Sequence, residues 1–189
     1  MAKLNYINSV IGIVKLDRKV ISSVANNEKS TLPAILSVVI FGVLVSLMAF
    51  LLLRLYSLFI PMYSTGFLAK FQLYSLYLSP ITGVVGLFLS AGVYWLFAKL
   101  FKPQSNYMGL VRSIGYLSPL SLLGIIPFVG TIVSIWYIVV EIIIVSETQK
   151  LSTGKAVGTV LIPIGIVLLF AFIIAIALIA YFTVHPVSL

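Results

Sequence analysis

The apolar stretch between Arg112 and Glu147 constrains this chain most, because it is too long for one ordinary membrane-spanning helix. It holds 34 residues, and its only charge is Glu141. As one helix it would be ~50 Å long, against a bilayer hydrocarbon core of ~30 Å. The helix-breaking residues near its middle are Gly124, Pro127 and Gly130. Proline removes a helical hydrogen bond and glycine tolerates the dihedral angles of a chain reversal, so the pattern predicts a helical hairpin.

The composition places the chain among membrane proteins. Hydrophobic residues make up 61% of the 189 residues and charged residues only 8%, too little polar surface for a soluble globule. The net charge of +8 does not indicate a nucleic-acid partner. The cations lie in short segments between apolar runs, where membrane orientation and anionic lipid headgroups account for them.

The apolar runs predict an all-α fold, a polytopic membrane bundle with five transmembrane helices. The predicted spans are residues 32–53, 79–98, 113–126, 129–146 and 157–182, and Pro80 suits the first turn of the second. Together they form a membrane domain over residues 31–182, followed by a short outer tail, 183–189. The third span is short for a crossing, so a full crossing and a re-entrant or strongly tilted arrangement both stay open.

Residues 1–30 form a basic segment whose apolar residues recur every three or four positions, as on one face of a helix. The pattern is typical of an amphipathic helix on the cytoplasmic membrane surface, with its basic side chains toward anionic headgroups. A partly ordered, solvated tail is an equally good interpretation.

The distribution of Lys and Arg predicts the orientation of the chain. With five spans and a cytoplasmic N-terminus, ten basic residues fall on the inside and two, Arg54 and Lys70, on the outside, as the positive-inside rule requires. A single crossing between Arg112 and Ser146 would move Lys150 and Lys155 outside and give eight against four. We therefore expect five spans in a multi-pass protein of the cell membrane.

The sequence shows no motif of an enzyme. It has no cysteine, no His-Glu-x-x-His and no glycine-rich phosphate loop, and its only histidine is His185, near the end. We expect no catalytic residues, no bound metal and no cofactor.

Glu141 is the one acidic residue inside a predicted span. An unpaired carboxylate there costs ~2.5 to 3.5 kcal/mol on insertion scales, so we expect it to be protonated, paired or beside a wet cavity. Arg112 is the nearest partner in an antiparallel hairpin. The pair would form either a proton or cation site or a polar clamp between helices, and the clamp is the favoured interpretation.

Several residues in and after the hairpin carry a resemblance to a known family. They are Arg112, Gly115, Tyr116, Pro119, Trp136, Ser152, Gly154, Lys155 and Ala156. With them, residues 16–180 resemble the Yip (Ypt-interacting protein) domain family. The resemblance implies five membrane helices and a cytosolic N-terminus. Eukaryotic members are associated with prenylated Rab-type GTPases and vesicle traffic.

Two departures limit what this resemblance implies. The segment before the first apolar run is shorter than the soluble region of eukaryotic members. The Asp-Leu-Tyr-Gly-Pro signature expected there is replaced by Ser30, Thr31, Leu32 and Pro33. The chain thus resembles the short prokaryotic members, and binding of a small GTPase is not carried over.

These patterns favour a non-enzymatic membrane scaffold or adaptor, with a role in membrane organisation or in a process like trafficking. Its partner would be a protein on the cytosolic face. The expected contacts are Arg18, Lys19, Lys102, Lys150 and Lys155. The alternative is a small ion-coupled transporter or permease that uses Glu141 within a homo-oligomer, because five helices leave little room for a pathway of their own.

Overall fold

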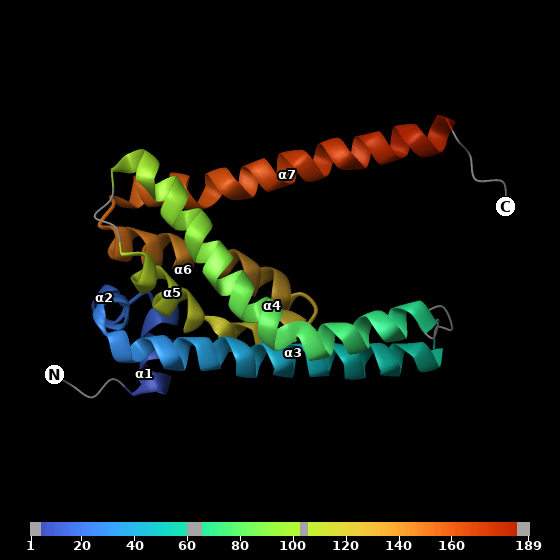
Figure 1. Cartoon of the computed structure of the whole chain (residues 1–189), viewed down its shortest axis with the longest axis horizontal. Helices are drawn as coiled ribbons and strands as arrows, with labels where there is room; N and C mark the ends of the chain where they lie inside the picture. Colours follow the sequence, from blue (N-terminus) through green and yellow to red (C-terminus); the bar gives the residue numbers. More distant parts are fainter. Residues whose placement is uncertain (1–4, 60–65, 103–105, 185–189) are drawn as a thin grey trace.

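The computed structural model of the chain describes residues 5–59, 66–102 and 106–184, and Figure 1 shows the arrangement of its helices. The α-helices are α1 (Tyr6–Val14), α2 (Arg18–Asn26), α3 (Thr31–Phe59), α4 (Gly66–Ala98), α5 (Tyr107–Gly115), α6 (Val129–Gln149) and α7 (Thr153–Val184). The short 3₁₀ segments are η1 (Glu28–Ser30), η3 (Lys99–Phe101) and η4 (Ser118–Ile125).

Helix α4 is longer than the predicted span 79–98, because it begins at Gly66 and continues through Pro80. Proline cannot donate a hydrogen bond to the carbonyl four residues earlier. The Ser79 hydroxyl donates to that carbonyl, on Leu76, at 2.9 Å. The neighbouring serine therefore restores the bond that Pro80 removes, and Pro80 lies inside the helix instead of in its first turn.

The predicted hairpin is confirmed. Segments α5 and η4 form its first arm, bent by 42°, and α6 returns as the second arm. Phe128 makes the reversal with a φ of 64°, and the Val129 N–H donates to the Pro127 carbonyl at 2.8 Å, which is a tight γ-turn. A Cβ at Gly130 would collide with the carbonyl oxygen of Gly124, so this close approach requires glycine.

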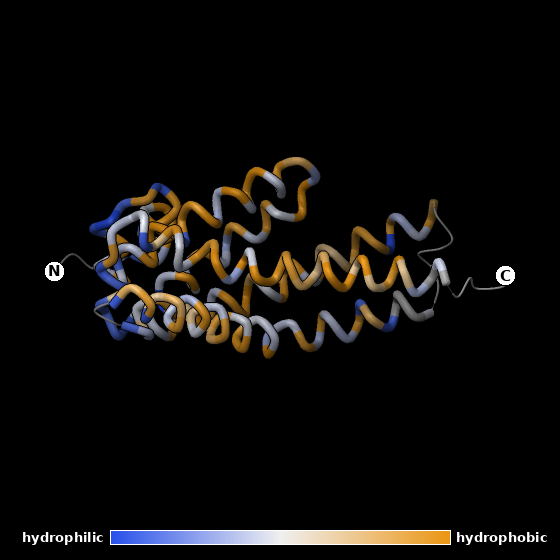
Figure 2. Tube along the Cα trace, turned by 90° about the horizontal axis from the view of Figure 1, so that it is seen from above, coloured by the Kyte–Doolittle hydropathy of each residue, from blue (hydrophilic) through white to orange (hydrophobic). Residues whose placement is uncertain are grey.

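The fold is an all-α polytopic membrane bundle, as predicted. Among the described residues, helices α3, α4, α6 and α7 are long and apolar enough to span a membrane, and the bent pair α5–η4 is a fifth candidate. Figures 1 and 2 show that the hairpin turns back well before the far ends of α3 and α4. Both ends of a hairpin lie on one side of the membrane, so a full crossing and a re-entrant hairpin give the same orientation to α7.

Polar residues gather at one end of the bundle, as the hydropathy colouring in Figure 2 shows. We call this the inner end. It contains α1, α2, α5, the first turns of α3 and α7 and the last turns of α4 and α6 (Figure 1). The opposite, outer end holds the remainder of α3, α4 and α7. Most of the buried residues lie at the inner end. They include Ile21, Val24, Ala34, Ala98, Leu110, Ile144 and Ala156.

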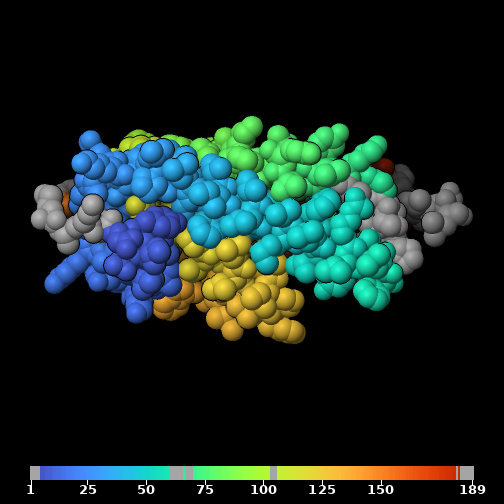
Figure 3. Space-filling view, turned by 90° about the horizontal axis from the view of Figure 1, so that it is seen from below, coloured from blue at the N-terminus to red at the C-terminus, as the bar shows by residue number. Residues whose placement is uncertain are grey.

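The N-terminal segment is packed, so its interpretation as a solvated tail is wrong. It forms two helices that turn at Leu16, where φ is 63°. Ile13 on α1 and Ile21 on α2 are fully buried, while Ile7 is 62% exposed. Figure 3 shows α1 against α3 and the hairpin. Ile7 and Ile11, on the apolar face assigned to the membrane surface, are exposed, so that interpretation of the segment stays a prediction.

Candidate functional site

Arg112 is the buried cation of the inner end. Helix α5 places it against α2 and the start of α3, where its side chain is only 8% exposed. Its Nε donates to Thr31 Oγ1 at 2.8 Å, and one terminal nitrogen donates to the Ala25 carbonyl, also at 2.8 Å. The Ala25 carbonyl lies in the last turn of α2, where helical carbonyls lack partners and the helix dipole favours a cation. Arg112 therefore joins three helices.

Glu141 lies on α6 and faces α4. The Tyr94 hydroxyl donates to Glu141 Oε2 at 2.8 Å. One turn earlier on α6, the Tyr137 hydroxyl donates to the Leu117 carbonyl at 2.7 Å. These two bonds join α6 to α4 on one side and to the first arm of the hairpin on the other.

The structure does not bring Arg112 and Glu141 together, so their predicted pairing is wrong. The pair was predicted because both residues lie near the same end of the hairpin. Their side chains, however, point to different neighbouring helices. Arg112 turns toward α2 and α3, whereas Glu141 turns toward α4. Glu141 accepts instead from the neutral phenol of Tyr94 on α4, and the choice between a polar clamp and a proton or cation site stays a prediction.

Two contacts hold the N-terminal helices onto α6. Arg18, at the start of α2, forms an ion pair with Glu147 at 2.6 Å. The indole Nε1 of Trp136 donates to the Val14 carbonyl at the end of α1, at 3.1 Å. Helix α1 is also held on its other side, where Tyr6 and Ser37 share a hydrogen bond of 2.6 Å. The N-terminal segment is thus bound to α6 on one side and to α3 on the other.

The remaining predicted contact residues are exposed at the inner end. Lys19 lies on α2, Lys102 follows η3, and Lys150 and Lys155 flank the connection from α6 to α7. Other exposed lysines in the same region are Lys15, Lys29 and Lys99. The acidic side chains there are Asp17, Glu28 and Glu147, of which Glu147 is engaged by Arg18. The described part of this end therefore carries an excess of positive charge.

Several of the residues that carry the family resemblance pack against neighbouring elements at the inner end. A Cβ at Gly115 would be 2.8 Å from the Cβ of Ala34, so α5 and α3 touch closely there. The Tyr116 ring lies 5.1 Å from the Tyr6 ring. Pro119 lies in the first turn of η4, and Ala156 is fully buried. Gly154 and Lys155 are exposed in the first turn of α7.

Sequence reasoning missed Tyr94 as the partner of Glu141, and a signal for it exists. Leu87, Ala91, Tyr94 and Ala98 recur at spacings of four, three and four, and all four are buried in the structure. This period marks the face of α4 that packs into the bundle. A tyrosine on such a face needs a hydrogen-bond partner, and Glu141 is the acidic residue within a span.

Metal chemistry has no support among the described side chains. They contain no group of three or more His, Cys, Asp or Glu residues that could hold a metal ion. His185 lies outside the described residues.

Comparison with known proteins gives one family match. The model of the Yip1 domain matches residues 15–181, which covers every helix from α2 to α6 and nearly all of α7. No curated protein and no solved structure matches the chain significantly.

Proposed function

The chain belongs to the Yip1 domain family, whose members are generally non-enzymatic integral membrane proteins, and we propose that it is a scaffold or adaptor. Its inner end would face the cytosol and bind a partner protein there. The proposal includes an orientation with the N-terminus in the cytosol, a location in the cell membrane, and no catalysis or cofactor.

One observation carries the proposal, namely the combination of rigidity and positive charge at the inner end. Arg112 joins α2, α3 and α5, and the Arg18–Glu147 pair joins α2 to α6. Around these ties, Lys19, Lys102 and Lys150 are exposed. A rigid surface loses little conformational entropy on binding, and a field of one sign attracts a partner of opposite charge. The fitting partner is a protein with an acidic surface.

Charge reversal tests the proposal. We expect K102E/K150E to abolish capture of a cytosolic partner by the purified protein in detergent, at unchanged folded yield. The matched control is R54E/K70E, which makes the same change of charge at the outer end, where Arg54 and Lys70 are exposed. Capture that is equal for both variants and the parent would contradict the scaffold proposal.

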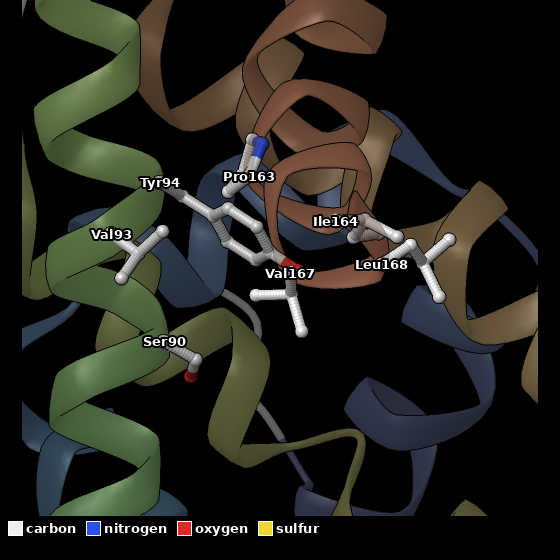
Figure 4. A pocket seen from close by; sticks show the side chains of 7 residues that line it. All are labelled: Ser90, Val93, Tyr94, Pro163, Ile164, Val167 and Leu168. Atoms are coloured by element: carbon white, nitrogen blue, oxygen red, sulfur yellow. The ribbon is translucent and has the colours of Figure 1, made fainter. Parts of the chain in front are cut away.

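An ion-coupled transporter is the second candidate, and Glu141 is the observation that favours it. The carboxylate lies within a helix long enough to span the membrane and contacts Tyr94, which lines a cavity between α4 and α7 (Figure 4). If the protein is a scaffold, Glu141 carries no protons, and the amide oxygen of Glu141→Gln still accepts the bond from Tyr94. We therefore expect this variant to leave proton flux into proteoliposomes unchanged. A large loss of flux in a variant with the parent's folded yield would favour the transporter.

A further inference from the structure

Helix α1 has three sides that differ in their surroundings. Ser9 and Ile13, one turn apart, lie on the side that is buried. Asn8 lies on a second side and is exposed. Ile7 and Ile11, also one turn apart, share the third side and are 62% and 45% exposed. The described part of the protein therefore leaves an apolar side of α1 open.

The open side of α1 faces away from α2. A Cβ at Gly12 would lie 2.8 Å from Cγ1 of Val20, so α2 packs against α1 at this glycine. Gly12 follows Ile7 by five residues, which separates the two by ~140° around the helix axis. Ile7 therefore lies on the side of α1 that is turned away from α2.

Helix α1 itself carries no charged residue. The nearest described basic residue is Lys15, which directly follows the helix and is exposed. The nearest acidic residue is Asp17, whose Oδ1 accepts from the backbone N–H groups of Lys19 and Val20 at the start of α2. No charge on α1 thus opposes contact between its exposed isoleucines and hydrocarbon.

Both ends of α1 are bound to helices that are candidates to span the membrane. Near its start, Tyr6 shares a hydrogen bond of 2.6 Å with Ser37 of α3, and its ring lies 5.1 Å from that of Tyr116. At its end, the Val14 carbonyl accepts from the indole N–H of Trp136 on α6 at 3.1 Å. Helix α1 thus connects α3 to the second arm of the hairpin.

The contacts at the two ends of α1 lie at about the same depth in the bundle. The Tyr137 hydroxyl donates to the Leu117 carbonyl at 2.7 Å. Tyr137 and Leu117 directly follow Trp136 and Tyr116, which hold the two ends of α1. The helix therefore runs across the bundle, close to parallel to the membrane plane, as interfacial helices do.

This depth is that of the inner boundary of the hydrocarbon. Counting ~20 residues, or ~30 Å of helix, back along α3 from Arg54 leads to Ala34. A Cβ at Gly115 would lie 2.8 Å from the Cβ of Ala34, and the next residue is Tyr116, which packs on Tyr6. Helix α1 therefore lies where acyl chains meet headgroups, the level at which tyrosine and tryptophan are enriched.

The lipid-facing surface of the bundle continues on both sides of α1. Leu36 and Ile40 on α3 are exposed, and so are Ile132 and Ile135 on α6. Both helices are long and apolar enough to span a membrane. Figure 3 shows α1 on the surface beside α3 and the hairpin. Lipid that covers these two helices would therefore also reach the open side of α1.

We propose that α1 is an interfacial helix whose Ile7 and Ile11 contact the acyl chains of the leaflet around the inner end. Asn8 lies toward headgroups and water, and Lys15 reaches the lipid phosphates. Interfacial helices bury their apolar face about 5–10 Å into the boundary between headgroups and acyl chains. The inference requires no protein partner, so its test is separate from that of the scaffold proposal.

Spin labels on single cysteines test the contact with lipid. The chain has no native cysteine, so Ile7→Cys, Ile11→Cys and Asn8→Cys each place one nitroxide on α1 in phosphatidylcholine proteoliposomes. Molecular oxygen concentrates among acyl chains, whereas a nickel chelate stays in water. We expect the ratio of collisions with oxygen to collisions with the chelate to be several-fold higher at positions 7 and 11 than at position 8.

Two exposed positions calibrate this ratio. Ile40→Cys on α3 reports the lipid-facing surface, and Ser23→Cys on α2 reports water at the inner end. A ratio at positions 7 and 11 equal to that of the Ser23 variant would place both isoleucines in water and overturn the proposal. Rare collisions with both reagents would show that protein covers the side instead, and dipolar broadening of the spectra would identify a second copy of the chain.

Quenching by labelled lipids measures the depth of α1. A bimane on Ile7→Cys should be quenched several-fold more strongly by phosphatidylcholine with a nitroxide near the top of its acyl chain than by one with the nitroxide near the chain end. The opposite order would mean deep insertion and would overturn the interfacial assignment. Ile7 and Ile11 are exposed, so we expect both labels to leave the unfolding temperature unchanged, and the two positions should agree.

Discussion

The inner and outer ends of the bundle are built on different principles. At the inner end, short helices pack on every side of one another, and a buried arginine links three of them. Toward the outer end, α3, α4 and α7 continue with few protein neighbours, and none of the most apolar window of α7 is buried. The inner end resembles a small soluble protein, whereas the outer end depends on lipid to cover its surface.

The comparison predicts where substitutions should lower the stability of the protein. Packing and buried hydrogen bonds make the inner end sensitive to the loss of a single atom group. On the outer helices an apolar side chain is in contact with lipid both in the native bundle and when the helices separate, so its exchange for another apolar residue changes little. Matched variants at the two ends can measure this difference.

The largest effect should come from Arg112→Met. It leaves the buried Ala25 carbonyl and the Thr31 hydroxyl without their donor, and each such group costs about 1–3 kcal/mol. We expect the free energy of unfolding in detergent to fall by about 2–5 kcal/mol, with Arg112→Lys intermediate. Arg54→Met, an exposed arginine near the outer end of α3, should change it by less than about 0.5 kcal/mol. Similar losses for both would remove the distinction between the ends.

The next largest effect should come from Gly115→Ala. The new Cβ would lie 2.8 Å from the Cβ of Ala34 and 3.0 Å from its carbonyl oxygen, so α5 must move away from α3, at a cost of about 1–3 kcal/mol. The control is Gly86→Ala on α4, where a Cβ meets nothing within 4 Å. That variant should be neutral or more stable by up to about 1 kcal/mol. Thermal unfolding of both variants decides the matter, and a Gly115→Ala protein as stable as its parent would contradict the close packing.

A smaller effect is expected for Tyr94→Phe, which removes the hydrogen bond to Glu141. The partly buried carboxylate then lacks that donor, and we expect a loss of about 1–2 kcal/mol. Glu141→Gln should cost less, because its amide oxygen can accept the same bond. Tyr74→Phe, at a 64% exposed tyrosine on the outer part of α4, is the control. If Tyr94→Phe and Tyr74→Phe unfold at the same temperature, Tyr94 does not clamp the helices.

The smallest effect should come from the Arg18–Glu147 ion pair. Its side chains are 51% and 23% exposed, and exposed pairs contribute about 0.2–1 kcal/mol. A double-mutant cycle of Arg18→Ala and Glu147→Ala should give a coupling energy in this range that falls as salt is added. Lys19→Ala in place of Arg18→Ala should show no coupling to Glu147. A coupling well above 1 kcal/mol would mean that this contact matters as much as the buried ones.

The sequence predicted the elements better than their packing. Long apolar runs indicate spans because each needs ~20 residues to cross the bilayer, and the Gly124–Gly130 region marked the hairpin correctly. Pro80 led to a wrong predicted start for α4, because the Ser79 hydroxyl replaces the backbone hydrogen bond that the proline removes. In general, a breaker residue counts only if no neighbour compensates for it.

The candidate site was only partly predictable, for a geometric reason. Position along a helix follows directly from residue number, so Arg112 and Glu141 were correctly placed within or beside the hairpin. The direction of a side chain around the helix axis depends on which neighbours the helix has. The N-terminal helices supply the Ala25 carbonyl to Arg112, and no local pattern in the sequence indicated that contact. Partner assignments failed where they required the tertiary arrangement.

The short hairpin has a consequence for the membrane itself. Because α5, η4 and α6 turn back before the far ends of α3 and α4 (Figures 1 and 2), the protein has a larger cross-section in one leaflet than in the other. It therefore displaces more lipid molecules from the leaflet around its inner end. Many copies in one patch would expand that leaflet relative to the opposite leaflet. The patch would relieve the difference in area by curving, with the leaflet around the inner ends on its convex side.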